Sequence, residues 1–151
     1  MRAREFINEK WQVPPLTFQQ INALRIMALV DYEDGAEAYM RGDYKTAFGK
    51  WGPVAEQGDA DAQLWLGVMY KDGRGVSQDF ETAIQWFALA AEQENPYAQF
   101  NLGEMHSNGL GVPKNHEIAA KWFGLAAEQG MARAQFHLGL LNAYGHGVRQ
   151  N

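Results

Sequence analysis

Residues 62–91 read AQLWLGVMYKDGRGVSQDFETAIQWFALAA, and residues 98–127 repeat the same pattern as AQFNLGEMHSNGLGVPKNHEIAAKWFGLAA. The two stretches align at an offset of thirty-six residues without insertion, and the alignment continues to Ala134-Gln135 and Leu138-Gly139. A fixed period of this size is typical of a solenoid, in which each unit buries its apolar face by stacking on the next unit. The sequence therefore predicts a repeat array without a single central core.

Each unit contains two helical segments joined by a glycine-rich turn. Between about residues 60 and 71 the apolar residues recur at helical spacing. Gly73 is expected to end this first helix in the left-handed conformation, and Asp79 is a good N-cap for the second helix. Gly67 lies inside the first helix, where glycine costs up to about 1 kcal/mol relative to alanine. We therefore expect another helix to approach closely at Gly67, and we assign the fold to the all-α class.

These positions resemble the Sel-1-like repeat, a relative of the tetratricopeptide repeat. Its pattern is Ala-x-x-x-Leu-Gly-x-x-Tyr-x-x-Gly-x-Gly-Val, followed by Asp-x-x-x-Ala-x-x-Trp-Phe-x-x-Ala-Ala. Residues 62–91 meet the pattern in full, and residues 98–127 meet it with His106 in place of the Tyr and Asn115 in place of the Asp. The resemblance covers about residue 31 to the end of the sequence. It implies an α/α right-handed superhelix of helix pairs, a class of fold that usually serves as an adaptor between proteins.

The repeat phase divides residues 31–151 into units. The expected units are about 31–58, 59–94 and 95–130, with a half unit at 131–151. The first unit omits the five residues that contain Gly-Val elsewhere, and Lys50 stands where later units have Trp. An atypical end unit is typical of a capping repeat. At the other end, Asn151 occupies the N-cap position of a second helix, so the last unit is expected to contain one helix.

Two further segments precede the repeats. Residues 1–15 show no clear period and end in Pro14-Pro15, which predicts a flexible arm. Residues 16–30 are predicted to form an N-terminal capping helix over the first repeat, starting at a capping box made by Thr17 and Gln20. Whether this helix continues into the first unit, or a fresh one starts at Asp31 or Asp34, is left open by the sequence.

Composition limits the classes of partner. The formal net charge is -5, and no two basic residues are adjacent, so the basic patch of a nucleic-acid binder is missing. No stretch approaches the length of apolar chain that spans a membrane. The sequence carries no export signal as written, which predicts a cytoplasmic protein, although the absence of cysteine is equally compatible with an exported or periplasmic one.

No familiar catalytic or metal-binding pattern is present. The only serines, Ser77 and Ser107, lie in no nucleophile motif, and the four histidines form no metal-binding pair at helical spacing. The sequence therefore predicts neither an enzyme nor a bound cofactor or metal. Two alternatives remain: a metal site assembled across repeats from His106 and His137, and, by family analogy alone, a hydrolase acting on β-lactams or the cell wall.

The predicted function is a protein–protein interaction module. In tetratricopeptide repeats, which this repeat resembles, the first helix of each unit lines a concave groove that binds a segment of a partner. Leu64, Phe100 and Phe136 would then form an apolar ladder with polar groups beside it, as in peptide-binding surfaces. The alternative is that position 64 and its equivalents pack between adjacent units. The groove positions are Leu64, Val68, Lys71, Tyr97, Phe100, Glu104, Asn108, Arg133, Phe136, Leu140 and Tyr144.

Self-assembly is the second candidate function. The segment 16–30 is apolar nearly all round, and a last helix without a second helix beside it would leave leucines uncovered. Either feature could dock on a second copy to give a homodimer. The residues expected at such a contact are Ile26, Met27, Leu29, Val30, Leu138 and Leu141.

Overall fold

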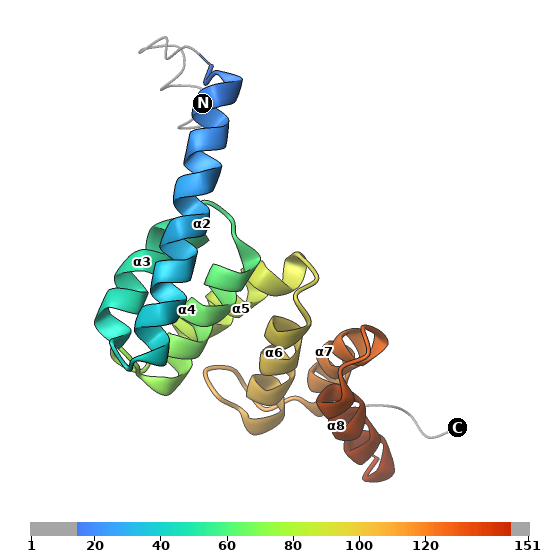
Figure 1. Ribbon diagram of the computed structural model, residues 1–151. Coiled ribbons are helices and arrows are strands. Elements are labelled where there is room, and N and C mark those ends of the chain that lie inside the picture. The colour runs from blue at the N-terminus through green and yellow to red at the C-terminus, as the bar shows by residue number, and fades with distance from the viewer. Residues whose placement is uncertain (1–14, 146–151) are drawn as a thin grey trace, which may run out of the picture. The chain divides into compact units, whose positions relative to one another are not determined.

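The computed structural model describes residues 15–145, and within this range it contains seven α-helices and no strand (Figure 1). The predictions made for residues 1–14, for His146 and for Asn151 lie outside the described residues. The all-α fold class is confirmed. The helices are α2 (Phe18–Met40), α3 (Tyr44–Glu56), α4 (Ala60–Asp72), α5 (Phe80–Glu92), α6 (Pro96–Asn108), α7 (His116–Glu128) and α8 (Ala132–Ala143).

The chain divides into two compact units, residues 1–30 and residues 31–151. The helix α2 begins in the first unit and ends in the second, so the predicted helix over 16–30 is not a separate element. The physical reason is that no proline or glycine occurs between Leu16 and Asp34. Thr17 and Gln20 form the expected capping box: the Thr17 amide donates to Gln20 Oε1 at 2.8 Å, and the Gln20 amide donates to Thr17 Oγ1 at 3.2 Å.

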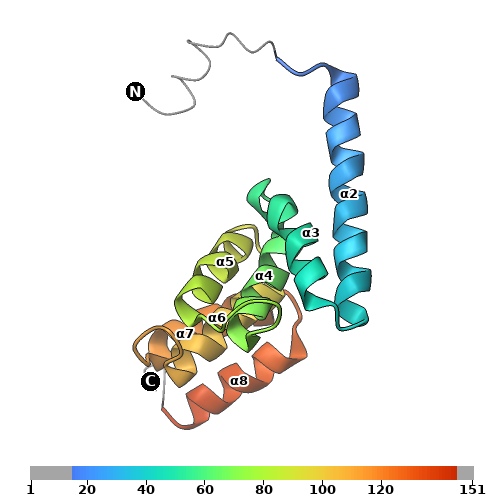
Figure 2. The same ribbon diagram turned by 90° about the vertical axis from the view of Figure 1, so that its left-hand side faces the viewer.

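In the second unit, the helices from α3 to α8 pack on their neighbours in the chain, and most extensively within the pairs α4–α5 and α6–α7 (Figures 1 and 2). The pairs α4–α5 and α6–α7 are complete repeats, and each of their four helices has 13 residues. Packing between sequence neighbours is the defining property of a solenoid. We refer below to the first helix of a repeat as helix A and to the second as helix B.

The ends of the helices follow the capping residues. Gly73 and Gly109 end α4 and α6 with φ values of 67° and 68°, in the left-handed region where glycine has no steric cost. In the helices α3 to α7, the side chain of the N-cap residue accepts a hydrogen bond from the backbone amide three residues further on, which satisfies a donor that the helix leaves free. These N-cap residues are Asp43, Asp59, Asp79, Asn95 and Asn115.

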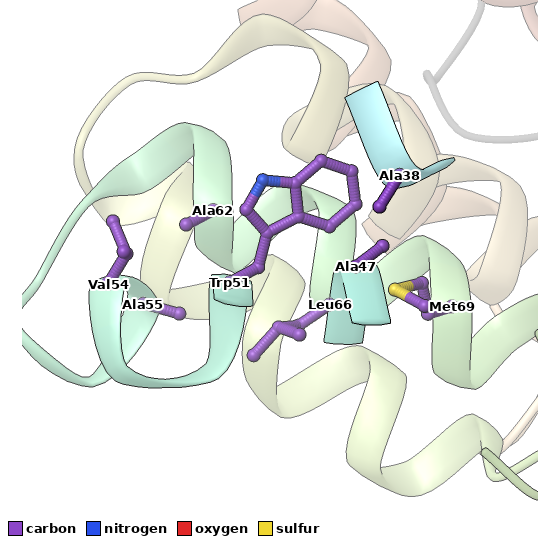
Figure 3. Close-up of a cluster of buried hydrophobic side chains, with 8 residues drawn as sticks. All are labelled: Ala38, Ala47, Trp51, Val54, Ala55, Ala62, Leu66 and Met69. Carbon is purple, nitrogen blue, oxygen red and sulfur yellow. The ribbon is translucent and has the colours of Figure 1, made fainter. Parts of the chain in front are cut away.

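The first core cluster surrounds Trp51, which occupies the position of Phe87 in the next repeat (Figure 3). The indole is almost completely buried, and its Nε1 donates to the carbonyl oxygen of Tyr32 at 3.0 Å. A side chain on Gly35 would place its Cβ 2.6 Å from that nitrogen, so α2 can lie against the ring only because residue 35 is glycine. The other members of the cluster are Ala38, Ala47, Val54, Ala55, Ala62, Leu66 and Met69.

The close approach expected at Gly67 is confirmed. A Cβ on Gly67 would lie 2.5 Å from the Phe87 ring, and a Cβ on Gly103 would lie 2.6 Å from the Phe123 ring. Distances this short are far inside van der Waals contact, so each helix A accepts the aromatic ring of its own helix B in a slot left by the missing side chain. The helix-A glycine and the helix-B phenylalanine of a repeat are therefore one packing unit.

Candidate functional site

The surface formed by the first helices of the units, here called the helix-A surface, contains a pocket of about 370 Å³. Every side chain that lines it comes from α2, α4 or α6, and the part of α2 involved belongs to the second compact unit. The pocket is large enough for one or two apolar side chains of a partner, and it lies at the low end of the range for ligand sites. Its lining residues are Tyr32, Asp61, Leu64, Trp65, Val68, Tyr97 and Asn101.

The pocket lining includes one aromatic side chain that is held in place by stacking. The Trp65 ring stacks on the buried Trp51 ring with a centroid separation of 5.4 Å and an interplanar angle of 17°. Tyr97 is 62% exposed at the start of α6, and Val68 is half-buried on α4. Rigid, partly exposed aromatic side chains give a large contact area at low entropic cost, which is why they are enriched where proteins bind each other.

Polar groups beside this lining already have hydrogen-bond partners. The Lys71 amine donates to Asn101 Oδ1 at 2.8 Å, and the Asn101 amide donates to the carbonyl oxygen of Tyr97 at 2.8 Å. On the other side, the Asn95 amide donates to Asp61 Oδ1 at 3.0 Å. These bonds fix the orientation of one amide and one carboxylate at the rim, where they can recognise a partner without being ordered first.

The Tyr32 hydroxyl is a neutral group of the pocket lining. Burial raises the pKa of Tyr32 above its usual range, and the negative charge of Asp61 acts in the same direction. The phenol therefore keeps its proton at neutral pH. It can donate a hydrogen bond to a carbonyl or carboxylate of a bound segment.

The structure differs from the sequence prediction at two members of the apolar ladder. Leu64 is 9% exposed and Phe100 is 5% exposed, because each lies in a core cluster formed by the helix B of its own repeat and the helix A of the next repeat. Phe100 lies 5.5 Å from the Phe123 ring and 5.3 Å from the His137 ring. For these two residues, the alternative interpretation, that position 64 and its equivalents pack between adjacent units, agrees with the structure. Leu64 nevertheless also lines the pocket.

The remaining groove positions fall into two groups. Val68 and Tyr97 line the pocket, and Lys71 donates a hydrogen bond to Asn101, which also lines it. Further along α6, Glu104 is half-buried and Asn108 is exposed. The other four lie at α8: the Arg133 guanidinium stacks over the Phe100 ring at 5.0 Å, and Phe136, Leu140 and Tyr144 are exposed. The structure does not bring these four to the pocket.

Four residues that line the pocket were not among the predicted ones: Tyr32, Asp61, Trp65 and Asn101. A signal for three of them exists in the repeat alignment. Framework positions keep their chemistry from unit to unit, whereas two positions one helical turn apart change it: Asp61, Tyr97 and Arg133 are equivalent, as are Trp65, Asn101 and His137. Variation against a fixed framework indicates positions whose residue type the repeat fold does not dictate.

The histidines make structural contacts. His137 lies 5.1 Å from the Phe123 ring, and burial lowers the pKa of His106. Among residues 15–145, no cluster of three or more His, Asp or Glu side chains has an arrangement that could hold a metal ion. Among the described residues, neither His106 nor His137, the pair considered for a metal site, belongs to such a cluster.

The residues expected at a self-association contact differ in their exposure to solvent. Ile26, Met27, Leu29 and Val30 are exposed on α2. On α8, Leu138 is half-buried and Leu141 is buried against α7 in the third core cluster, so Leu141 is not available as an open contact. The reason is that one side of α8 packs on the preceding helix B even though its own helix B is not among the described residues.

Within the described residues, no helix has the length and apolar character needed to cross a membrane.

Comparison with known proteins agrees with this architecture. A family model described as the Sel1 repeat matches residues 60–95, 96–131 and 132–151, which together exceed half of the chain. The Sel1 repeat protein from Oxalobacter formigenes is similar at 37% identity and a TM-score of 0.75, over 80% of this chain and 48% of that one. A second solved structure is c5321, a protective antigen present in uropathogenic Escherichia coli strains displaying an SLR fold. It is similar at 34% identity and a TM-score of 0.79, over 85% of this chain and 28% of that one. No curated protein matches the sequence.

Helix pairs that stack only on their neighbours define the class of solenoid repeat proteins. The chain belongs to the Sel1 repeat family, as the Sel-1-like pattern of residues 62–91 and 98–127 indicated. It spans less than half the length of the two solved bacterial chains above. The Sel1 repeat solenoid is commonly a protein-interaction module and is generally a non-catalytic scaffold.

Proposed function

We propose that this chain binds a segment of a partner protein on the helix-A surface, with an apolar side chain of the partner in the pocket between α2, α4 and α6. The observation that carries the proposal is the pocket itself: stacked Trp65 and exposed Tyr97 provide apolar contact, and the hydrogen-bonded Asp61 and Asn101 supply polar groups of its lining. An apolar centre with a polar rim is the arrangement that protein interfaces use.

The anchors in this proposal differ from those the sequence suggested. Phe100 is a core residue, and its replacement would disturb folding before it disturbed binding. Tyr97 is the better probe because its side chain is mostly exposed, and Asn101 is a matched polar probe on the same helix. Leu125 is an exposed apolar residue on α7, outside the pocket, and serves as the control position.

The test starts with capture and identification of a partner from the native host, followed by titration of the purified partner. Double substitution Tyr97→Ala with Asn101→Ala should weaken the affinity by at least about tenfold, because truncation of a central aromatic residue typically costs more than 1 kcal/mol. Leu125→Ala should bind like the unsubstituted chain. Equal affinity of all three proteins would contradict the proposal.

Self-assembly is a second candidate because the helix segment 16–30 exposes apolar side chains on several sides. Phe18, Ile26, Met27 and Leu29 are all exposed, and Arg25 is the only charged residue of the segment. A contiguous exposed apolar surface of this kind marks a contact site. Light scattering at rising concentration tests it: a dimer that Ile26→Lys with Leu29→Lys converts to monomer supports the candidate, and a monomer at every concentration contradicts it.

A further inference from the structure

The pocket on the helix-A surface carries the carboxylate of Asp61 at the start of α4. Asp61 is the only charged side chain that lines this pocket. Its Oδ1 accepts from the Asn95 amide at 3.0 Å, and no lysine, arginine or histidine of the described residues forms an ion pair with it. The side chain is exposed, so its second oxygen is open to a donor from outside. A bound segment without a positive charge would partly dehydrate this carboxylate and leave it unpaired, which costs free energy.

Tyr97 belongs to the same end of the pocket as Asp61. Both residues lie in the first turn of a helix A, at positions that are equivalent in the repeat. The bond from Asn95 to Asp61 holds the carboxylate at the start of α6, two residues before Tyr97. A carboxylate together with an exposed aromatic ring is a combination that suits arginine, because the guanidinium donates to the oxygens and stacks on the face of the ring.

The charges around the pocket favour a cation at this end. Burial is the main cause of the raised pKa of Tyr32, and the negative charges of Asp61 and Asp59 raise this pKa further, so both carboxylates act on the pocket lining. Lys71 follows Asp61 by ten residues on α4, which places the two backbones about 15 Å apart along the helix axis. Salt screens charges over about 8 Å under physiological conditions, so Lys71 does not cancel the attraction at Asp61.

The chain itself contains arginines stacked on aromatic rings at two places. The Arg133 guanidinium lies 5.0 Å from the centre of the Phe100 ring. The Arg74 guanidinium lies 5.9 Å from the ring centre of Tyr39 and 5.4 Å from that of Tyr44, and it donates to the Tyr39 hydroxyl at 2.7 Å. Aromatic residues of α2 and α6 therefore already make this contact within the chain.

We infer that the segment bound on the helix-A surface carries an arginine close to its apolar anchor, and that this arginine pairs with Asp61 and stacks on Tyr97. The inference rests on the proposed function, because it names the chemistry of the segment that the pocket binds. Trp65 and Val68 contact the apolar anchor. Val68 follows Asp61 by about 10 Å along α4, and an extended segment rises about 3.3 Å per residue. The arginine is therefore within about three residues of the anchor.

The probes are short glycine peptides that contain one leucine and one arginine, in either order and with at most two glycines between them. A matched set has citrulline in place of arginine, which keeps the shape of the side chain and removes its charge. NMR titration of the isotope-labelled full chain follows the amide signals of α4 and α6. At least one arginine peptide should bind at least about fivefold more tightly than its citrulline counterpart, as expected for a cation on an aromatic ring beside a carboxylate.

Asp61→Asn is the variant that tests the pairing, because it removes the charge and keeps an oxygen for the Asn95 amide. The preference for arginine over citrulline should disappear in this variant, while the citrulline peptides bind as before. Tyr97→Ala should weaken both sets of peptides. Glu117→Gln is the matched control, since it removes one charge from an exposed carboxylate in the first turn of α7, outside the pocket. This control should keep the preference for arginine.

Three outcomes would overturn the inference: equal affinity for the arginine and citrulline peptides, no binding of any arginine peptide, or a preference for arginine that Asp61→Asn retains. Equal affinity that Tyr97→Ala still weakens would leave the proposed function intact, because the pocket would then bind an apolar segment without a basic residue. The proposed function fails by a different result, in which Tyr97→Ala with Asn101→Ala leaves the affinity for the captured partner unchanged.

Discussion

Gln93 Nε2 lies 2.9 Å from Oε1 of Gln63 and 2.8 Å from the carbonyl oxygen of Gly58. Gln63 in turn donates from Nε2 to the carbonyl oxygen of Ala55 at 3.1 Å. One buried amide therefore joins the end of α3, the start of α4 and the end of α5. Since Gln129 makes the equivalent bonds to Gln99 and Glu94, this amide link is a repeated device that fixes how one unit stacks on the next.

Gln63→Ala should lower the free energy of unfolding by about 1–3 kcal/mol, because it leaves a buried carbonyl and the Gln93 amide short of a partner. Gln135→Ala is the matched control, since the same position in the last repeat is exposed and should change stability by less than about 0.5 kcal/mol. Urea denaturation followed by circular dichroism measures both. Similar losses for the two variants would show that the amide link is not the cause.

Glu94→Gly should stabilise the protein by about 0.5–1 kcal/mol. Glu94 has a φ of 63°, in the left-handed region, at the position that Gly58 and Gly130 occupy in the neighbouring repeats. Its carbonyl oxygen, which accepts from Gln129, is kept in the variant. The measurement is the shift of the urea midpoint relative to the unsubstituted chain. Gly130→Ala is the reverse substitution and should lower the midpoint, so a change of the same sign in both variants would contradict the backbone argument.

His106 should make stability depend on pH near neutrality. It occupies the position of Tyr70, burial lowers its pKa, and its Nδ1 has no hydrogen-bond partner among the described residues. As pH falls through the unfolded-state pKa of about 6.5, the unfolded chain takes up a proton that the folded chain resists, so stability is lost. The loss continues until pH has fallen through the lowered folded-state pKa.

His106→Tyr restores the residue that the preceding repeat has at this place and should remove this contribution. Between about pH 7.5 and pH 5.5, the thermal midpoint of the variant should fall less than that of the unsubstituted chain. The other histidines are present in both proteins, so the difference between the two pH profiles reports on His106 alone. Parallel profiles would show that His106 is not responsible.

The fold was predictable because the repeat period encodes it redundantly. Gly73 and Asp79 marked helix ends that the structure confirms, and Gly67 marked a close contact that it also confirms. Such positions have one physical reason for their identity, which the sequence shows directly. The sequence left the continuity of α2 open, because Asp31 and Asp34 are residue types that often begin a helix as its N-cap. In the structure both lie inside α2 and form ion pairs with Lys50, at 3.0 and 3.3 Å.

The candidate site was predictable only in part. The sequence identified the helix-A surface and its residues Val68 and Tyr97. It predicted an exposed side chain at position 64 and did not include position 65 in the groove. Adjacent residues on a helix point about 100° apart, and both Leu64 and Trp65 are apolar, so composition alone does not separate the buried one from the exposed one. The separation depends on which side the next helix packs, which is a property of the tertiary structure.

Phe100 and Phe136 occupy equivalent positions but differ in burial, so their substitution should affect stability to different extents. Phe100→Ala removes a buried ring that contacts the Phe123 ring, the His137 ring and the Arg133 guanidinium, and should cost about 3–5 kcal/mol. Phe136→Ala truncates a mostly exposed ring and should cost less than about 0.5 kcal/mol. Urea unfolding of both variants under the same conditions gives the comparison. If Phe100→Ala unfolded like the unsubstituted chain, Phe100 would not be a core residue. The apolar ladder predicted from the sequence, with Leu64 and Phe100 exposed to a partner, would then again be a candidate for the binding surface.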